Sequence, residues 1–190
     1  MLKKKSILIL NILFFFLSYS NLQANNKIEI VKNINNVETL KFNFIQKSFE
    51  KKETGICHLK RPHFLKCLYE DKNQKELIIN KRILVIYHKR YNKIYRYPLS
   101  KSYFLQILNG EKFSEVIMKG EMLINDDFSE VEYLDENKGQ IIFYFNNKNY
   151  DLIGWRLIDI NNNITVFEMS NQSKNIEIKK TFFSIPEENQ

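Results

Sequence analysis

The sequence predicts a mainly β domain, an antiparallel meander of short strands with short helices at its start and in its middle. Apolar and polar residues alternate over much of the chain, which is typical of half-buried strands. Tight turns such as Arg61-Pro62-His63 separate the alternating segments. Two stretches replace the alternation by helical spacing. The 190 residues suit one domain, since domains hold roughly 100–200 residues.

The first helix is predicted over residues 27–39, because apolar residues recur there at every third position and share one helical face. These residues are Ile28, Val31, Ile34 and Val37. From Leu40 onward the period changes to two, as expected for a strand with one buried face. The strands predicted in this half are Leu40–Phe49, Ile56–Lys60, Phe64–Tyr69, Glu76–Asn80, Ile83–His88 and Lys93–Tyr97.

The second helix is predicted over Ser102–Asn109, with Ser102 as its N-cap and Gly110 past its end. Strands resume after it, and Asn161-Asn162-Asn163 reads as a hairpin turn because Asn tolerates positive φ. The strands predicted in this half are Glu121–Asn125, Ser129–Leu134, Gln140–Asn146, Gly154–Asp159, Ile164–Ser170 and Ile176–Lys179.

The N-terminus has the three parts of a secretory signal peptide. Lys3-Lys4-Lys5 precede an apolar run over Ile7–Leu17, and small and polar residues follow. The run is shorter than the roughly 20 residues of a membrane span, although an uncleaved anchor is the alternative. Cleavage is expected after Ala24, with Ser20 as a second choice, so residues 1–24 form the signal peptide and residues 25–190 the mature domain. The run has no Cys after it to carry acyl chains, so we expect an exported, soluble protein.

Charge and motifs exclude several function classes. Lys and Arg number 29 against 22 Asp and Glu, a formal net charge of +7, and removal of Lys3, Lys4 and Lys5 with the signal peptide leaves +4. The excess of Lys, Asn and Ile runs along the whole chain, so the charge does not indicate a nucleic-acid partner. We find no phosphate loop, no nucleophile elbow and no paired carboxylates. We therefore expect no enzyme and no cofactor.

The two cysteines are interpreted as structural. Cys57, His58, His63 and Cys67 resemble metal ligands at first sight, but neighbours on a strand such as Cys57 and His58 point to opposite faces, so no metal site is expected. Cys57 and Cys67 are equally far from Pro62 in sequence and can lie opposite each other in a hairpin. An exported protein permits a disulfide there. The alternative is two small buried apolar residues.

Six segments occur in the order and spacing of one known family. They are Phe44-Ile45-Gln46-Lys47, Gly55 with Lys60-Arg61-Pro62, Leu65 with Cys67 and Tyr69, Leu84-Val85-Ile86-Tyr87, Phe104–Leu108, and Phe182-Phe183-Ser184-Ile185-Pro186. Together with the signal peptide, this series over residues 28–187 resembles the periplasmic outer-membrane lipoprotein carrier family, LolA. The chain departs from the family at Asn80-Lys81, where Asp-Gly is usual, and at Cys67, where an aromatic residue is common.

The resemblance implies an unclosed antiparallel β-barrel whose short helices form a lid over an apolar cavity. It implies a monomeric periplasmic carrier that takes triacylated lipoproteins from an inner-membrane ABC transporter and hands them to an outer-membrane receptor. It also implies that Arg61, the residue before Pro62, hydrogen-bonds the lid helices in a closed state. A lipid- or lipoprotein-sensing envelope-stress domain of the same fold is the alternative function.

The residues themselves are compatible with these roles. Arg61 has the strand parity of Cys57 and Leu59, and a guanidinium on that apolar side needs acceptors. The alternative is an Arg61 that reaches solvent from its turn. The expected cavity wall could equally be an ordinary filled core. It comprises Phe42, Phe44, Leu59, Leu65, Leu84 and Ile86, with Phe104, Leu105 and Leu108 from the lid.

Overall fold

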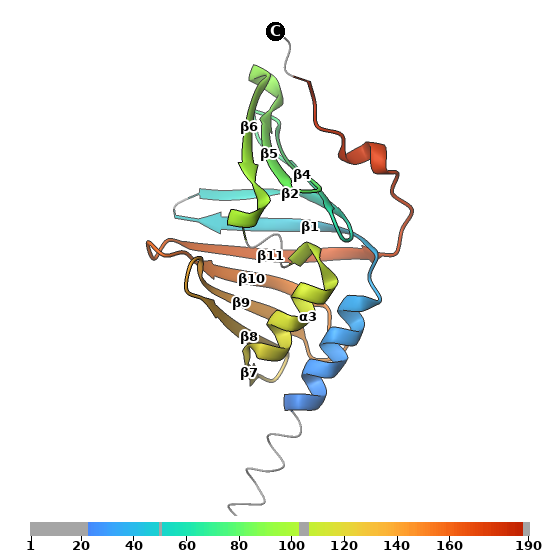
Figure 1. Cartoon of the computed structure of the whole chain (residues 1–190), viewed down its shortest axis with the longest axis vertical. Helices are drawn as coiled ribbons and strands as arrows, with labels where there is room; N and C mark the ends of the chain where they lie inside the picture. The colour runs from blue at the N-terminus through green and yellow to red at the C-terminus, as the bar shows by residue number, and fades with distance from the viewer. Residues whose placement is uncertain (1–22, 50, 103–106, 188–190) are drawn as a thin grey trace, which may run out of the picture.

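The computed structural model describes residues 23–49, 51–102 and 107–187. Within these ranges the chain forms one open sheet of 11 antiparallel strands in the order β6-β5-β4-β3-β2-β1-β11-β10-β9-β8-β7 (Figure 1). The predicted fold class, a strongly curved, unclosed sheet with short helices, is confirmed. The strands are β1 (Thr39–Ser48), β2 (Lys51–Lys60), β3 (Phe64–Tyr69), β4 (Lys75–Asn80), β5 (Ile83–His88), β6 (Lys93–Pro98), β7 (Glu121–Ile124), β8 (Phe128–Asp135), β9 (Gly139–Asn146), β10 (Leu152–Ile158) and β11 (Ile164–Lys174).

The sheet consists of two meanders that meet at its centre. Strands β1 to β6 run outward from the centre, and β7 to β11 return from the opposite edge. The two halves join where β1 pairs with β11 from Leu40↔Lys174 to Ser48↔Thr165, with one register shift between Lys41 and Asn43. This pairing brings residues more than 100 positions apart onto one curved apolar face.

Two helices lie across the face of the β8–β11 half (Figure 1). The first covers residues 23–35 and is called the N-terminal helix here, and the second is α3 (Gly110–Lys119). The N-terminal helix buries Ile30 and Ile34, whereas Ile28 is 53% exposed. The predicted face was therefore wrong at Ile28. Residues three apart fall 60° short of a full turn, so a strict spacing of three drifts off the face that Ile30 and Ile34 share at i, i+4.

Helix α3 was not predicted, since Gly110 was taken as the end of the preceding helix. In the structure residues 107–108 are helical, Asn109 is the N-cap of α3, and its side chain accepts a hydrogen bond from the Lys112 backbone N–H at 3.0 Å. Phe113, Val116 and Ile117 form the buried face of α3. Residues 1–22, most of the predicted signal peptide, and residues 103–106 lie outside the described residues.

The predicted strand Ile176–Lys179 is absent from the structure. This segment instead leaves the sheet after β11 and leads into the short 3-10 helix η3 (Lys180–Phe183). Phe183 is fully buried, 5.4 Å from the ring of Phe64, and its carbonyl accepts a hydrogen bond from the Asn80 amide. The segment thereby covers the outer face of β3 and β4, which explains why Ile78 is buried next to Leu77 and Ile79.

Substitution of Phe183 tests this packing. Phe183→Ala should lower the free energy of unfolding by about 3–5 kcal/mol, the usual cost of emptying a buried aromatic site. Phe49→Ala is the matched control, because Phe49 is 83% exposed and should change stability by less than about 0.5 kcal/mol. Urea titration measures both, and equal small effects would show that Phe183 is not packed against β3 and β4.

His58 makes the stability pH-dependent. Its ring lies 4.8 Å from Phe182, and burial, with smaller effects of Lys41 and Lys66, lowers its pKa from 6.5. The unfolded chain then takes up a proton at a higher pH than the folded chain, so stability falls as pH drops below 6.5. Urea titrations at a series of pH values give the free energy of unfolding as a function of pH. This free energy should fall less steeply with decreasing pH for His58→Gln than for wild type. An equal pH dependence in the two proteins would show that His58 is not its cause.

Candidate functional site

Two adjoining cavities lie between the curved face of the sheet and the helices. The first has a volume of about 50 Å³ and lies beside Ile34, Leu108 and Phe113 of the helical segments. The second has a volume of about 230 Å³ and extends toward Gln46 and Tyr69. Ile107, Trp155 and Phe167 line both cavities and form the wall between them.

The structure brings most of the sequence-predicted cavity residues together. Phe42, Leu59, Leu65 and Leu108 line the first cavity, and Ile86 lines the second. Phe44 and Leu84 are buried in the same core but line neither cavity. Phe104 and Leu105 lie outside the described residues.

Sequence reasoning missed the wall contributed by β10 and β11. Trp155 and Phe167 are opposite each other on these strands, and their rings stack at 4.1 Å. Phe167 also stacks on Phe44 of β1 at 5.0 Å, so an aromatic row crosses the junction of the two meanders. Both residues belong to predicted strands, but their position at the cavity depends on the pairing of β1 with β11. The local pattern does not contain that pairing.

Arg61 lies at the first cavity with its guanidinium between the two helices. Its Nη1 donates a hydrogen bond of 2.8 Å to the carbonyl of Ile34 in the last turn of the N-terminal helix, where a cation is favoured. Its Cζ lies 5.8 Å from the ring centroid of Phe113 on α3. A side chain at Gly110 would place its Cβ only 3.2 Å from Nη1, so glycine leaves room for the guanidinium.

The charge of Arg61 is incompletely compensated. Burial lowers the pKa of the guanidinium from 12.5 to about 10, and its Nε is buried without a hydrogen-bond partner. Among the described residues, no carboxylate forms an ion pair with it. Arg61 therefore contacts the N-terminal helix through one charged hydrogen bond and α3 through the ring of Phe113. The cost of desolvating its charge opposes the stability that these contacts contribute.

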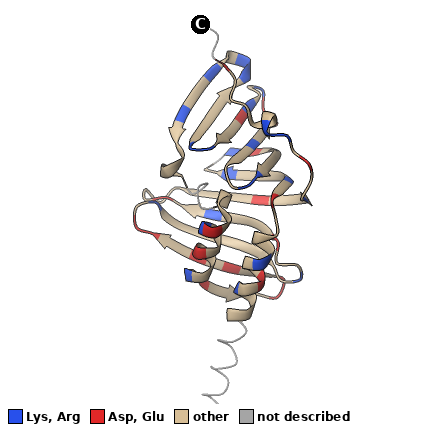
Figure 2. Cartoon of the chain, turned by 45° about the vertical axis from the view of Figure 1, so that its right-hand side comes forward, with Lys and Arg blue, Asp and Glu red and all other residues tan. Residues whose placement is uncertain are grey.

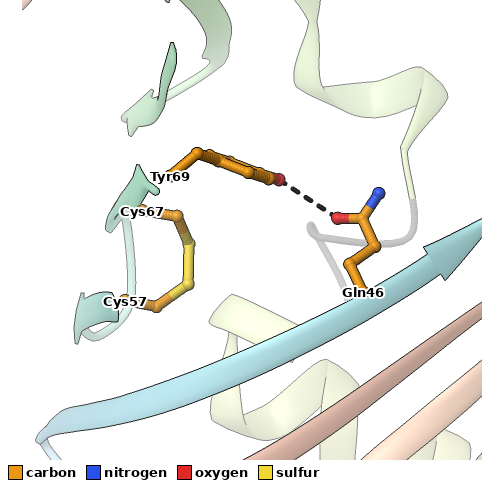
Figure 3. The surroundings of a disulfide bond; sticks show 4 residues. All are labelled: Gln46, Cys57, Cys67 and Tyr69. Atoms are coloured by element: carbon orange, nitrogen blue, oxygen red, sulfur yellow. Dashed lines mark hydrogen bonds between the residues drawn. A yellow bond between two sulfur atoms is a disulfide. The ribbon is translucent and has the colours of Figure 1, made fainter. Parts of the chain in front are cut away.

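The cysteines lie opposite each other in the β2–β3 hairpin, in the register that the sequence predicts. In the structure Cys57 and Cys67 form a disulfide, so neither retains a thiolate to bind a metal. Figure 3 shows the bond beside Tyr69, whose hydroxyl donates a hydrogen bond to the Gln46 side-chain oxygen at 3.1 Å. Burial raises the pKa of Tyr69, which keeps its hydroxyl a neutral donor at the second cavity.

The chemistry of the site is that of an apolar binding site. Its walls are aliphatic and aromatic, and the polar groups at its edges include Arg61, Gln46, Tyr69 and Lys75. Sites for small molecules enclose roughly 300–1,000 Å³, more than either cavity offers at 50 and 230 Å³. The two cavities as they stand are therefore too small for a long apolar ligand.

Comparison with known proteins identifies one family. The family described as Outer membrane lipoprotein carrier protein LolA matches residues 35–186. No curated protein matches the chain by sequence.

Solved structures share the fold at low sequence identity. An uncharacterized conserved protein from Thermus thermophilus aligns with a TM-score of 0.56 at 6% identity, over 88% of this chain and 96% of that chain. A DUF1329 family protein from Desulfovibrio piger aligns with a TM-score of 0.50 at 9% identity, over 86% and 96%. A LolA superfamily protein from Nitrosomonas europaea aligns with a TM-score of 0.44 at 9% identity, over 82% and 96%. The first two similarities support the fold alone.

Substitutions of Arg61 and Phe113 test whether the hydrogen bond of Arg61 and the desolvation of its charge offset each other in the free energy of unfolding. Arg61→Leu should change the free energy of unfolding by less than about 1 kcal/mol or raise it, because loss of the hydrogen bond is offset by relief of desolvation. Phe113→Ala, at a fully buried position, should lower it by about 3–5 kcal/mol. Denaturant titration gives both values, and a loss above about 2 kcal/mol for Arg61→Leu would contradict this balance.

Proposed function

Since the chain belongs to the outer membrane lipoprotein carrier family LolA, we propose that it carries the acyl chains of lipoproteins in the cavity beneath its helices. The observation that carries this proposal is the pair of adjoining apolar cavities, which share the wall of Ile107, Trp155 and Phe167, the first of them lying beneath the two helices. An acyl chain has no polar group to recognise, so a dry apolar surface is the complement that it needs.

The proposed route crosses the periplasm. Residues 1–24 direct export as a signal peptide, and the remaining chain receives triacylated lipoproteins from an inner-membrane ABC transporter. It then delivers them to a receptor at the outer membrane. Among the described residues, no helix combines the length and apolarity needed to cross a bilayer.

Binding must be strong enough to keep acyl chains from water and weak enough to release them. Burying one CH₂ is worth about 0.8 kcal/mol, so three fully buried chains would exceed the roughly −18 to −21 kcal/mol at which non-covalent affinity saturates. In our proposal the cost of opening the closed form offsets part of this gain. Because Ile34 and Phe113 lose their contacts with the sheet on opening, that cost is built into the fold.

In this proposal Arg61 sets the balance between the closed and open forms. It links the N-terminal helix to α3 through Ile34 and Phe113, yet its charge is poorly compensated when buried. An entering acyl chain that displaces the helices would return the guanidinium to water and relieve that cost. Release of the cargo would then re-form the hydrogen bond to Ile34 as the helices close.

A capture-and-transfer experiment tests the proposal. Purified protein is incubated with inner-membrane vesicles that release a triacylated lipoprotein, the bound lipoprotein is quantified, and its transfer to outer-membrane vesicles is followed. We expect wild type to bind and transfer the cargo. Arg61→Leu should bind the cargo but transfer it poorly, because leucine adds apolar contact with the bound acyl chains and cannot re-form the hydrogen bond to Ile34 when the helices close.

The matched control is Lys148→Leu, which removes the same charge from an exposed position in the β9–β10 loop. It should bind and transfer like wild type. Equal transfer by Arg61→Leu and wild type would contradict the role of Arg61 while leaving the carrier function. Absence of lipoprotein binding by wild type would contradict the carrier function and favour a sensor domain of the same fold.

A further inference from the structure

The hairpin of β5 and β6 carries charge of one sign. Between Leu77 and Gly110 the sequence contains seven Lys or Arg and no Asp or Glu, which equals the formal net charge of the whole chain, +7. These residues are Lys81, Arg82, Lys89, Arg90, Lys93, Arg96 and Lys101. Blue segments recur along this hairpin in Figure 2. The remainder of the chain is electrically balanced, and four of the seven cations, Lys89, Arg90, Lys93 and Arg96, lie on the hairpin itself.

The same hairpin exposes three tyrosines. Tyr91 is 57% exposed in the 3-10 turn η1 (Lys89–Tyr91), and Tyr95 and Tyr97 on β6 are 45% and 48% exposed. The guanidinium of Arg90 lies 5.9 Å from the ring centroid of Tyr91. Tyrosine combines an apolar ring with a polar hydroxyl, and it is enriched where proteins meet the membrane–water interface.

The tip of the hairpin is the connection between β5 and β6 together with the first residue of β6, residues 89–93. The cations at this tip have no carboxylate partner among the residues that the structure describes. Lys89, Arg90 and Lys93 form no ion pair there, whereas Lys66 and Lys75 on the neighbouring strands pair with Glu76 and Glu53. Strand β6 is also the outermost strand of its half of the sheet. Charge and ring surface at the tip are therefore available to an external partner.

The hairpin is continuous with the second cavity. Ile86 of β5 lines that cavity, as does Lys75, which is opposite His88. Tyr95 is opposite Ile86 and Tyr97 is opposite Leu84, so these two tyrosines extend the curved apolar face onto the edge strand. The tip itself projects at the end of the molecule away from the N-terminal helix (Figure 1).

We propose that this hairpin docks the protein on the surface of an anionic phospholipid bilayer. Lys89, Arg90 and Lys93 contact the lipid phosphates, and the three tyrosines lie at the level of the headgroups. A hairpin whose charged side chains are all cations suits a diffuse anionic partner, because a specific protein interface would combine a packed apolar centre with mixed polar groups. Docking places the tyrosines and the second cavity next to the lipid from which acyl chains come, so this inference rests on the proposed carrier function.

Vesicle flotation tests the proposal without any lipoprotein. Wild type is mixed with vesicles of phosphatidylcholine alone or with phosphatidylglycerol added, at low and at high salt. We expect binding to the anionic vesicles alone and its loss at high salt, since salt screens exposed charges. Combined Lys89→Gln, Arg90→Gln and Lys93→Gln should weaken partitioning about a hundredfold, because each cation near an anionic surface contributes about 1 kcal/mol.

A matched variant separates the site from the net charge. Combined Lys112→Gln, Lys119→Gln and Lys148→Gln removes the same charge from exposed positions outside the hairpin and should bind the anionic vesicles about as well as wild type. Tyr91→Trp should also bind, and its emission should shift to the blue and be quenched by brominated lipid. Trp155 is 7% exposed and gives a constant background.

Three results would overturn the proposal. They are equal binding to neutral and anionic vesicles, equal losses for the two charge variants, and a fluorescence emission of the Tyr91→Trp variant that does not respond to lipid. A fourth result, absence of vesicle binding by wild type, would also overturn it and would assign the hairpin to an acidic protein surface instead. Lipoprotein capture can succeed in that case, so failure of docking is distinguishable from failure of the carrier function.

Discussion

The apolar concave face of the open sheet must be kept from water, and the remaining features of the structure follow from how this is done. The face exists because β1 pairs with β11 and joins two meanders, which places Phe44, Phe167 and Trp155 in one aromatic row. A closed barrel would bury this face permanently. In an open sheet the helices cover it, and a cover that packs by apolar contact can be exchanged for another apolar body of suitable shape.

The cover is attached at several points that differ in character. The helices are tied to each other by the Lys27 ammonium, which donates to the Gly120 carbonyl at the C-terminal end of α3. The N-terminal helix is tied to the β9–β10 loop by the Asn33 amide, which donates to the Tyr150 carbonyl. Arg61 differs from both, because it combines a helix contact with a buried, undercompensated charge. In our proposal this attachment breaks while the sheet stays folded, and the burial of Phe183 against the outer face of the sheet supports that separation.

Much of this architecture could be predicted from local sequence patterns, and the failures have physical causes. The bounds of β3 and β5 were predicted correctly, and so was the pairing of Cys57 with Cys67. Apolar–polar alternation and a tight turn between two strands are local signals, so they determine a hairpin without long-range information. Helix α3 was missed because Gly110 serves as its first residue, although Asn109 followed by Phe113, Val116 and Ile117 is a capped helical pattern. The β10–β11 wall of the cavity depends on long-range pairing, and the size of the cavity depends on side-chain packing that no periodicity records.

The distance between the N-terminal helix and the sheet is the measurement that tests the central claim most directly. Spin labels on cysteines introduced at the exposed residues Lys32 and Lys41 would report it, since Cys57 and Cys67 are joined in a disulfide and do not react. Pulsed electron spin resonance is then recorded with a triacylated lipopeptide and with the same peptide lacking acyl chains. We predict a longer distance with the acylated peptide and an unchanged distance with the peptide that lacks acyl chains. An unchanged distance while that peptide is bound would show that acyl chains do not enter beneath the helices.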